Sequence, residues 1–516
     1  MQTFKADLTE GLGTGEPGDE TREIDEEIQK LQAQIRALRT RRNRLTLISK
    51  LPAEIMTLIF SIARDLHLTD LSPSMGKAIL IITWVCQDWR ELAFAIPELW
   101  NVIDLKAIEF VQSSLERSKN LPLSVELLGI TPDTPSLPFI LQSIPRTKSL
   151  QLTSLVDQPN LSLAAGWQQP APLLEKLTLD SFSFSNMSFA GTIPPLRKLS
   201  LSECRFNWKD LPLPTHLQSL RIVGSEPRLS SRDILSLLQL IPNLKVLGLY
   251  QTLEELGRVG PRLDTLPFVN HTHLSRLLVE DETADAALTL FQRLKTPSNT
   301  YISVRCAYDQ FTRPHRRFQL LRVIGQCRSP AEEVLPISLK IMIRIQLETS
   351  AIEVTTKGDQ ADGRGFRVEF PDLNNPSDVE STIAVCDLLN LQDLETMVID
   401  CHVDAPRTLS SLIFGHSPVL RILKIRGRAS SGFIQRFTQE TQKDISAFPL
   451  RELEYLELEK IQRPTPDLYL LRLALTAWKN RLGHRLQKLV IVMEGLMEGM
   501  ESFEGVVEHV EYRETA

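Results

Sequence analysis

The chain has 516 residues, of which 42% are hydrophobic and 24% are charged, and this balance is typical of folded globular proteins. A chain of this length exceeds a single compact core, so it predicts two to four domains or a repeat array. The formal net charge is −6, and without a basic excess to release phosphate counterions the composition argues against nucleic-acid binding.

Targeting and redox features are sparse. The longest apolar stretch, Ala78 to Cys86, is about half of the roughly 20 residues that a membrane-spanning helix needs. The polar, Gly-rich N-terminus does not have the pattern of a signal peptide. Six scattered cysteines form no CxxC pair, which is typical of reduced thiols used as small core residues. We therefore expect a cytoplasmic or nuclear protein with no membrane partner.

The N-terminal part predicts disorder and then a helix. Residues 1–20 carry four glycines and several acids and have little to bury. A heptad follows within residues 21–46, with acids at its start and arginines at its end, as the helix dipole favours; its apolar positions are Ile24, Ile28, Leu31, Ile35, Leu38 and, one heptad later, Leu45. Arg42 interrupts this seam. Two interpretations stay open, a homodimer through residues 24–45 or an amphipathic helix that folds back on its own domain.

Residues 47–105 predict two amphipathic helices, a turn and a short strand. Pro52 fits the first turn of a helix, and a stripe at helical spacing comprises Leu51, Ile55, Leu58, Ile59 and Ile62. After a polar loop with Pro73 and Gly76, a second stripe runs over residues 81–96 until Pro97 ends it: Ile81, Val85, Trp89, Leu92 and Ile96. Residues 97–100 predict the turn, and residues 101–105 the strand.

This segment resembles an F-box, and more narrowly the F-box of fungal proteins with an N-terminal coil. The matching elements are Leu51-Pro52-x-Glu54-Ile55-x-x-x-Ile59-Phe60, Val85-Cys86-x-x-Trp89-Arg90-x-Leu92-Ala93 and Pro97-x-Leu99-Trp100. Each element alone is unspecific, but their order and spacing together fit the family. The resemblance covers residues 48–105, and the stretch between the helices, 65–77, is longer than in many members.

The resemblance implies a small all-α bundle that docks on the Skp adaptor of a cullin–RING ubiquitin ligase. Carried over residue by residue, the adaptor contacts are Leu51, Pro52, Ile55, Ile59, Val85, Cys86 and Trp89. The alternative is that these positions only pack the core of the bundle. For Leu51 and Pro52 the interface is favoured, because the start of a helix in an isolated domain would carry polar residues.

Residues 106–493 repeat the pattern Leu-x-x-Leu-x-Leu or its Ile, Val and Met equivalents. Copies begin at Leu174, Leu196, Leu217, Leu244, Leu274, Leu394, Leu420, Leu453 and Leu486, with a partial copy at Leu150-Gln-Leu152. Apart from the gap after Leu274, the copies are 21 to 33 residues apart, at or just above the leucine-rich-repeat period of about 20–29. The alternation predicts short strands stacked in a parallel sheet, with a column of Leu177, Leu199, Leu220 and Leu247 inside it and helices such as 231–240 outside.

The repeat is degenerate. The Asn or Cys expected after each strand is matched at Cys204, while Phe182 and Thr252 occupy the same position elsewhere. Residues 281–390 lose the phase, although 300–305 and 338–345 predict strands and the glycine-rich 358–365 predicts a hairpin or loop. This region is either an insertion in a continuous array, which we favour, or the seam between two arrays. The acidic tail, 494–516, predicts a loose end or a cap.

No catalytic site is expected. His271-Thr-His273 could place two rings on one strand face, but no Cys or third His completes a metal set, so solvated loop histidines are expected. The predicted fold class is α/β, an F-box bundle followed by an irregular leucine-rich-repeat solenoid, without cofactor or metal. The predicted function is the substrate-recruiting subunit of a Skp–cullin–F-box ubiquitin ligase with an unknown target protein. The alternatives are a leucine-rich-repeat interaction scaffold without ligase activity, and an enzyme with an unrecognised site in residues 281–390.

Overall fold

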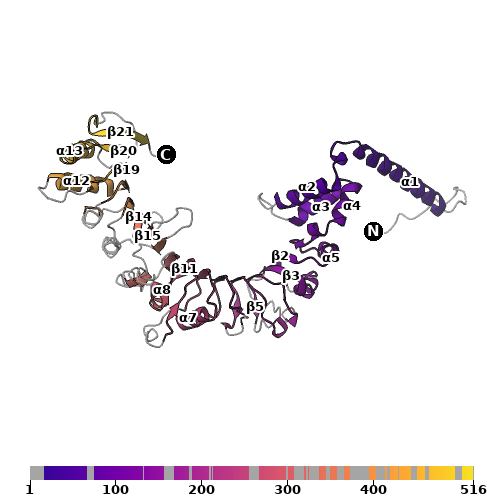
Figure 1. The fold of residues 1–516 in the computed structure, drawn as a ribbon. Helices are drawn as coiled ribbons and strands as arrows, with labels where there is room; N and C mark the ends of the chain where they lie inside the picture. The colour runs from indigo at the N-terminus through magenta and orange to yellow at the C-terminus, as the bar shows by residue number, and fades with distance from the viewer. Residues whose placement is uncertain are drawn as a thin grey trace, which may run out of the picture. The chain divides into compact units, whose positions relative to one another are not determined.

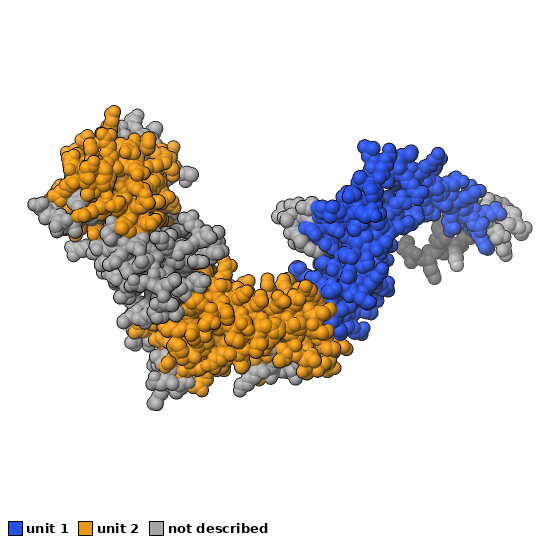
Figure 2. Space-filling view, viewed as in Figure 1, with its two compact units in different colours: residues 1–128, 134–146 blue, residues 129–133, 147–516 orange. Residues whose placement is uncertain are grey.

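The computed structural model has a mixed α/β fold with a parallel sheet. It describes residues 17–66, 75–131, 133–155, 168–184, 189–208, 211, 213–254, 266–297, 300–306, 319–320, 323–324, 336–344, 349–356, 365–371, 394–401, 413–414, 419–427, 429–442, 450–459, 464–493 and 502–514. The chain divides into two compact units, coloured separately in Figure 2: residues 1–128 with 134–146, and residues 129–133 with 147–516. The predicted disordered segment, 1–20, lies almost wholly outside the described residues.

The first unit is mainly helical. Its elements are α1 (Pro17–Arg44), η1 (Ile48–Lys50), α2 (Ala53–Leu66), α3 (Met75–Val85), α4 (Gln87–Ala95), η2 (Pro97–Trp100), β1 (Val102–Ile103), α5 (Ile108–Arg117), β2 (Leu123–Ile130), α6 (Leu137–Gln142) and η3 (Ile144–Arg146). Helices α2, α3 and α4 pack on one another, and β1 pairs in parallel with β2. The unit continues past residue 105, where the sequence predicts the end of the F-box-like segment, through α5 and α6.

The heptad helix and the first amphipathic helix are confirmed as α1 and α2, but the single helix predicted over 81–96 is wrong. The chain is extended at Cys86 (φ −160°, ψ 173°), which separates α3 from α4. Gly76, predicted in a loop, lies in the first turn of α3, where its amide donates a 2.8 Å hydrogen bond to Asp104 Oδ1. A Cβ at this position would lie 2.5 Å from the same oxygen, so the close approach requires glycine.

The second unit carries a long sheet (Figure 1). Its main strands are β3 (Thr147–Ser154), β4 (Lys176–Asp180), β6 (Lys198–Ser202), β8 (Ser219–Val223), β9 (Val246–Tyr250), β11 (Arg276–Glu282), β13 (Tyr301–Cys306), β14 (Pro336–Arg344), β15 (Thr349–Thr356), β16 (Gly365–Pro371), β17 (Thr396–Cys401), β18 (Ile422–Arg426), β19 (Tyr455–Glu459), β20 (Leu486–Met493) and β21 (Val507–Glu514). Two small parallel pairs flank it: β5 (Ser183–Phe184) with β7 (Arg205–Phe206), and β10 (Val269–Asn270) with β12 (Leu294–Lys295).

The predicted leucine column is confirmed. Strands β3, β4, β6, β8, β9, β11 and β13 pair in parallel, in that order, and the residues in register are Leu150, Leu177, Leu199, Leu220, Leu247, Leu277 and Ile302. Each of these side chains is at most 1% exposed. The alternation of apolar and polar residues therefore gives every strand one fully buried face.

The pairing continues through the region where the pattern loses its phase. Strand β16 lies parallel to β13, β15 lies antiparallel between β16 and β14, and β14 is parallel to β17. The strands predicted at 300–305 and 338–345 are confirmed as β13 and β14, whereas β15 and β16 were not predicted. The strand ladder is thus continuous, but it includes antiparallel pairs. The hairpin or loop predicted at 358–365 lies outside the described residues except for Gly365, which begins β16.

The turns after the first strands repeat one backbone conformation. Ser181, Glu203, Gly224 and Gln251, which follow β4, β6, β8 and β9, all have positive φ, between 49° and 64°. The residue that follows each of these turns is buried. These residues are Phe182, Cys204, Ser225 and Thr252. The helix predicted at 231–240 is confirmed as α7 (Ser231–Leu240), which starts with a capping box between Ser230 and Asp233. Further along the chain lies α8 (Ala284–Phe291), and it packs on β11.

The C-terminal end of the sheet is covered by two long helices. Helices α12 (Ala429–Gln442) and α13 (Pro464–Leu482) lie side by side and contact β18 and β20 respectively (Figure 1). The tail does not end loosely after Met493, because β21 pairs in parallel with β20 over its whole length. Of the two interpretations of the tail, a loose end or a cap, the structure therefore supports the cap.

Candidate functional site

The inner faces of α2, α3 and α4 form a small apolar core. Met56 and Phe60 of α2 and Ile79 of α3 are at most 5% exposed. The Phe60 ring packs against Trp89 of α4, with centroids 5.0 Å apart. Just after α4, the indole N–H of Trp100 donates a 2.9 Å hydrogen bond to the carbonyl of Ala93. These contacts fix the three helices independently of their outer faces.

The outer faces of α2 and α3 are also apolar, and the described chain leaves them in solvent. We call this set the α2/α3 surface; its members, with their exposed fractions, are Leu51 (40%), Ile55 (45%), Leu58 (56%), Ile62 (49%), Ile81 (50%), Trp84 (70%) and Val85 (54%). Isolated exposed apolar residues are ordinary, but six on two packed helices, with Leu51 just before the first of them, are typical of a protein-binding surface.

The predicted adaptor contacts divide into two groups. Leu51, Pro52, Ile55 and Val85 are exposed and free to meet a partner. The other three, Ile59, Cys86 and Trp89, are half-buried, and Trp89 also packs the core through Phe60. The exposed residues fit the interpretation as adaptor contacts. The half-buried residues fit the alternative, in which they pack the core of the bundle.

Trp84, the most exposed member of the α2/α3 surface, was not predicted. It lies three residues after Ile81 and directly before Val85, so the helical spacing places it on the same face of α3. This spacing is the signal in the sequence that could have identified it.

Two further contacts hold the ends of these helices. Arg44, the last residue of α1, donates to both carboxylate oxygens of Asp88 in α4, each at 3.2 Å. Arg117 of α5 lies over the rings of Phe94 and Trp100, 4.1 and 4.9 Å from their centroids. Helix α4 is thus connected to α1 through Asp88 and to α5 through Phe94.

A second candidate surface is the open face of the sheet in the second unit. Here the residues in register across β4, β6, β8 and β9 are Thr178, Ser200, Arg221 and Gly248. The guanidinium of Arg221 lies over the Tyr250 ring, 4.7 Å from its centroid, and a Cβ at Gly248 would lie 2.9 Å from that ring. The face combines small polar side chains with one cation–aromatic pair, which suits contact with another protein chain.

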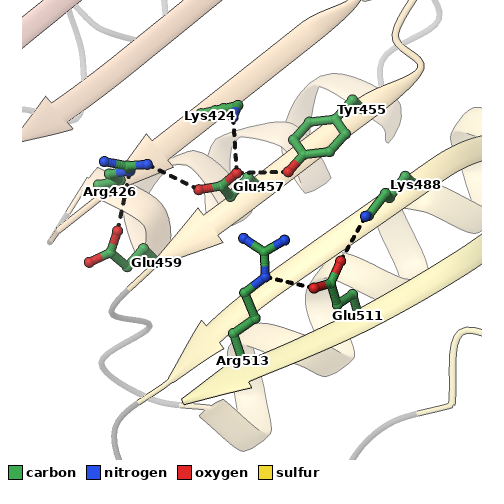
Figure 3. Close-up of polar contacts among 8 residues, drawn as sticks. All are labelled: Lys424, Arg426, Tyr455, Glu457, Glu459, Lys488, Glu511 and Arg513. Carbon is green, nitrogen blue, oxygen red and sulfur yellow. Dashed lines mark hydrogen bonds and ion pairs between the residues drawn. The ribbon is translucent and has the colours of Figure 1, made fainter. Parts of the chain in front are cut away.

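Towards the C-terminus the same face carries interlocked charges (Figure 3). Glu457 is the centre: its carboxylate accepts a 2.7 Å hydrogen bond from the Tyr455 hydroxyl and lies 3.4 Å from both Lys424 Nζ and Arg426 Nη2. On the next strands, Lys488 and Arg513 each approach Glu511 to 2.7 Å. The groups come from four neighbouring strands, β18 to β21, and form two adjoining clusters.

Ionisation in these clusters follows from the contacts. Burial opposes the ionisation of Glu457, but the hydrogen bond from Tyr455 and the charges of Lys424 and Arg426 outweigh it, so its pKa is lowered. Burial and the bond to Glu457 raise the pKa of Tyr455 to about 12. Hydrogen bonds from Arg513 and Lys488 lower the pKa of Glu511 to about 2. At neutral pH, both carboxylates are charged and paired, so the clusters hold neighbouring strands together.

Groups that could carry chemistry are isolated in the described residues. In these ranges no three His, Cys, Asp or Glu side chains gather at metal-binding distance. The expectation of solvated loop histidines is wrong for His271, which is 2% exposed, lies with Nε2 3.0 Å from the Ile241 carbonyl, and has its pKa lowered by burial. His273 is exposed. Of residues 281–390, where an unrecognised active site was considered, more than half lie outside the described ranges.

Comparison with known proteins gives no match, whether with family models, curated proteins or solved structures. Among the helices that the structure describes, none combines the length and apolarity needed to cross a membrane. Function is therefore argued from the two surfaces described above.

Proposed function

We propose that this protein is the substrate-recruiting subunit of a Skp–cullin–F-box ubiquitin ligase. In this proposal residues 48–105 are an F-box that binds the Skp adaptor, and the sheet of the second unit is a leucine-rich-repeat solenoid that holds the target protein. The chain itself performs no chemistry and acts by bringing the target to the ligase.

The observation that carries the proposal is the α2/α3 surface. Leu51, Ile55 and Val85 belong to the segment that resembles an F-box, and each is at least 40% exposed although it is apolar. A fold stabilised only from within would bury these residues or replace them by polar ones. The core residues Met56 and Phe60 on the same helix show that α2 has a separate inner face.

The second unit supports the target-binding half. Seven parallel strands share one buried apolar column, and the opposite face of the sheet carries mainly polar and charged residues. Successive strands bring side chains from distant parts of the sequence into one surface, as a leucine-rich repeat does. Arg221, Tyr250 and the Glu457 cluster combine cationic, aromatic and acidic groups. This combination favours a protein or peptide partner over a nucleic acid.

Co-purification with a Skp adaptor tests the proposal. The full chain should retain the adaptor, and the double change Leu51→Ala with Pro52→Ala should weaken binding at least about tenfold, since central apolar anchors each contribute about 1–4 kcal/mol. Both residues lie at the start of α2 and are exposed, so the melting temperature should shift little. Failure of the unaltered chain to bind any Skp adaptor would refute the ligase function and leave a repeat scaffold.

A further inference from the structure

Helix α1 presents an apolar stripe that the described chain does not cover. Its members, with their exposed fractions, are Ile24 (55%), Ile28 (45%), Leu31 (49%), Ile35 (48%) and Leu38 (65%). The helix does not fold this stripe back on its own unit. The alternative of an intramolecular helix is therefore not realised in the structure, and the stripe needs an external occupant.

We propose that the occupant is α1 of a second copy of this chain, packed antiparallel. The 4, 3, 4, 3 spacing of the stripe is the a/d pattern of a coiled coil, in which Ile28 and Ile35 are a positions and Ile24, Leu31 and Leu38 are d positions. In an antiparallel pair each a residue faces a d residue of the other helix. One alignment places Ile28 beside Leu38 of the second copy and Leu31 beside Ile35, which gives four apolar layers at the centre of the pair.

The charges that border the stripe select this orientation. Positions e and g, which flank the seam, hold Asp25, Gln32 and Arg39 on one side and Glu27, Gln34 and Arg41 on the other. In antiparallel coiled coils e faces e and g faces g. Asp25 then meets Arg39 of the second copy, Glu27 meets Arg41, and the glutamines meet themselves at the centre. Because the arrangement is two-fold symmetric, each of the two charged pairs occurs twice.

A parallel pair would not gain these contacts. Position g would face e of the following heptad, which places Glu27 opposite Gln32 and Gln34 opposite Arg39. Arg42, at an a position, would meet Arg42 of the second copy inside the seam, where like charges are destabilising. In the antiparallel alignment Arg42 instead lies beside Ile24, at the frayed end of the interface.

The remaining charges of α1 are compatible with the antiparallel pair. Arg44 is held by Asp88 of its own chain and is not needed in the interface. Glu27 approaches Lys30 at 3.8 Å in an exposed contact, which contributes little and can be exchanged for Arg41 of the second copy. This inference does not rest on the ligase proposal, because a scaffold would dimerise through α1 in the same way.

Sedimentation equilibrium of the full chain tests the interface itself. We expect a dimer at micromolar concentration, and a monomer for the variant with Leu31→Asp and Ile35→Asp, which places four charges in the seam. The matched control carries Gln29→Asp and Ala33→Asp, on the outer side of the same helix, and should stay dimeric. A monomeric unaltered chain, or a control that dissociates as fully as the seam variant, would overturn the proposal.

Charge reversal tests the orientation. The change Asp25→Arg with Glu27→Arg should raise the dimer dissociation constant at least about tenfold, because arginine then faces arginine at four places. Adding Arg39→Glu and Arg41→Glu to the same chain should restore the dissociation constant to near its original value, since every pair is again of opposite sign. A dimer whose dissociation constant does not change on the first reversal, or does not recover on the second, would overturn the antiparallel arrangement.

Discussion

Thr252, directly after the turn that ends β9, donates its hydroxyl towards the carbonyl of Ile222 on the preceding strand, at 3.2 Å. The same hydroxyl lies 3.0 Å from the carbonyl of Tyr250 on its own strand. Cys204 repeats this arrangement two repeats earlier, after β6, with its thiol 3.5 Å from Leu179 O and 3.1 Å from Ser202 O. At both turns the buried side chain thus adds a contact to the carbonyl of the preceding strand, at the end of the sheet.

Removing the Thr252 hydroxyl should destabilise the second unit. Thr252→Val keeps the shape but removes the hydroxyl donor to the buried Ile222 carbonyl, which should cost about 1–3 kcal/mol in free energy of unfolding. Urea titration followed by circular dichroism measures this. Thr178→Val, on the open face of β4, is the matched control and should be near neutral. Equal effects of the two changes would show that the buried hydrogen bonds do not contribute.

The leucine column gives a second stability prediction. Leu199 lies between Leu177 and Leu220 in register and is 1% exposed, so Leu199→Ala should cost about 2–5 kcal/mol through lost burial and a residual cavity. Ser200→Ala, one residue further and on the open face, should stay within about 0.5 kcal/mol of the unaltered protein. Similar losses for both would contradict the assignment of the two faces.

The burial of each strand explains whether the strand could be predicted from the sequence. The column strands were predictable because one face is wholly buried and the apolar residues alternate without exception, as in β4 and β6. Strand β21 was not, since only Val507 is buried and the strand is held by backbone pairing with β20. The helix break at Cys86 could not be predicted from the sequence either, because an extended residue between two helices needs neither Gly nor Pro. Trp84, by contrast, stands three residues after Ile81 and could have been placed on the candidate surface from the helical spacing.

The Glu457 cluster predicts a pH dependence of stability. Its pKa is lower in the folded protein than in the unfolded chain, so it stabilises the fold above the ordinary carboxylate pKa. This contribution is lost as the pH falls through the lowered, folded-state pKa. In thermal melts from neutral to acidic pH, Glu457→Gln should be less stable at neutral pH and should lose less stability on acidification. The exposed Glu452→Gln should follow the unaltered protein; identical pH profiles for all three would contradict the prediction.

Two tryptophans of the first unit separate binding from folding. Trp84 is 70% exposed on α3, while Trp89 on α4 is half-buried against Phe60, with ring centroids 5.0 Å apart. Large aromatic side chains at an interface are frequent binding hot spots, so Trp84→Ala should weaken adaptor binding by about tenfold or more, corresponding to at least ~1.4 kcal/mol. The melting temperature should stay near its original value, because Trp84 contributes little to the core.

Trp89→Ala is the matched change with the opposite expectation. Truncating a ring that packs on Phe60 removes buried contacts, which should cost about 3 kcal/mol and lower the melting temperature together with adaptor binding. Calorimetry and a binding titration on both variants separate the two cases. If Trp84→Ala left adaptor binding unchanged while Leu51→Ala with Pro52→Ala abolished it, the adaptor would contact the start of α2 and not α3. If instead Trp84→Ala lowered the melting temperature as much as Trp89→Ala, Trp84 would pack in the core. This result would contradict its exposed position on α3.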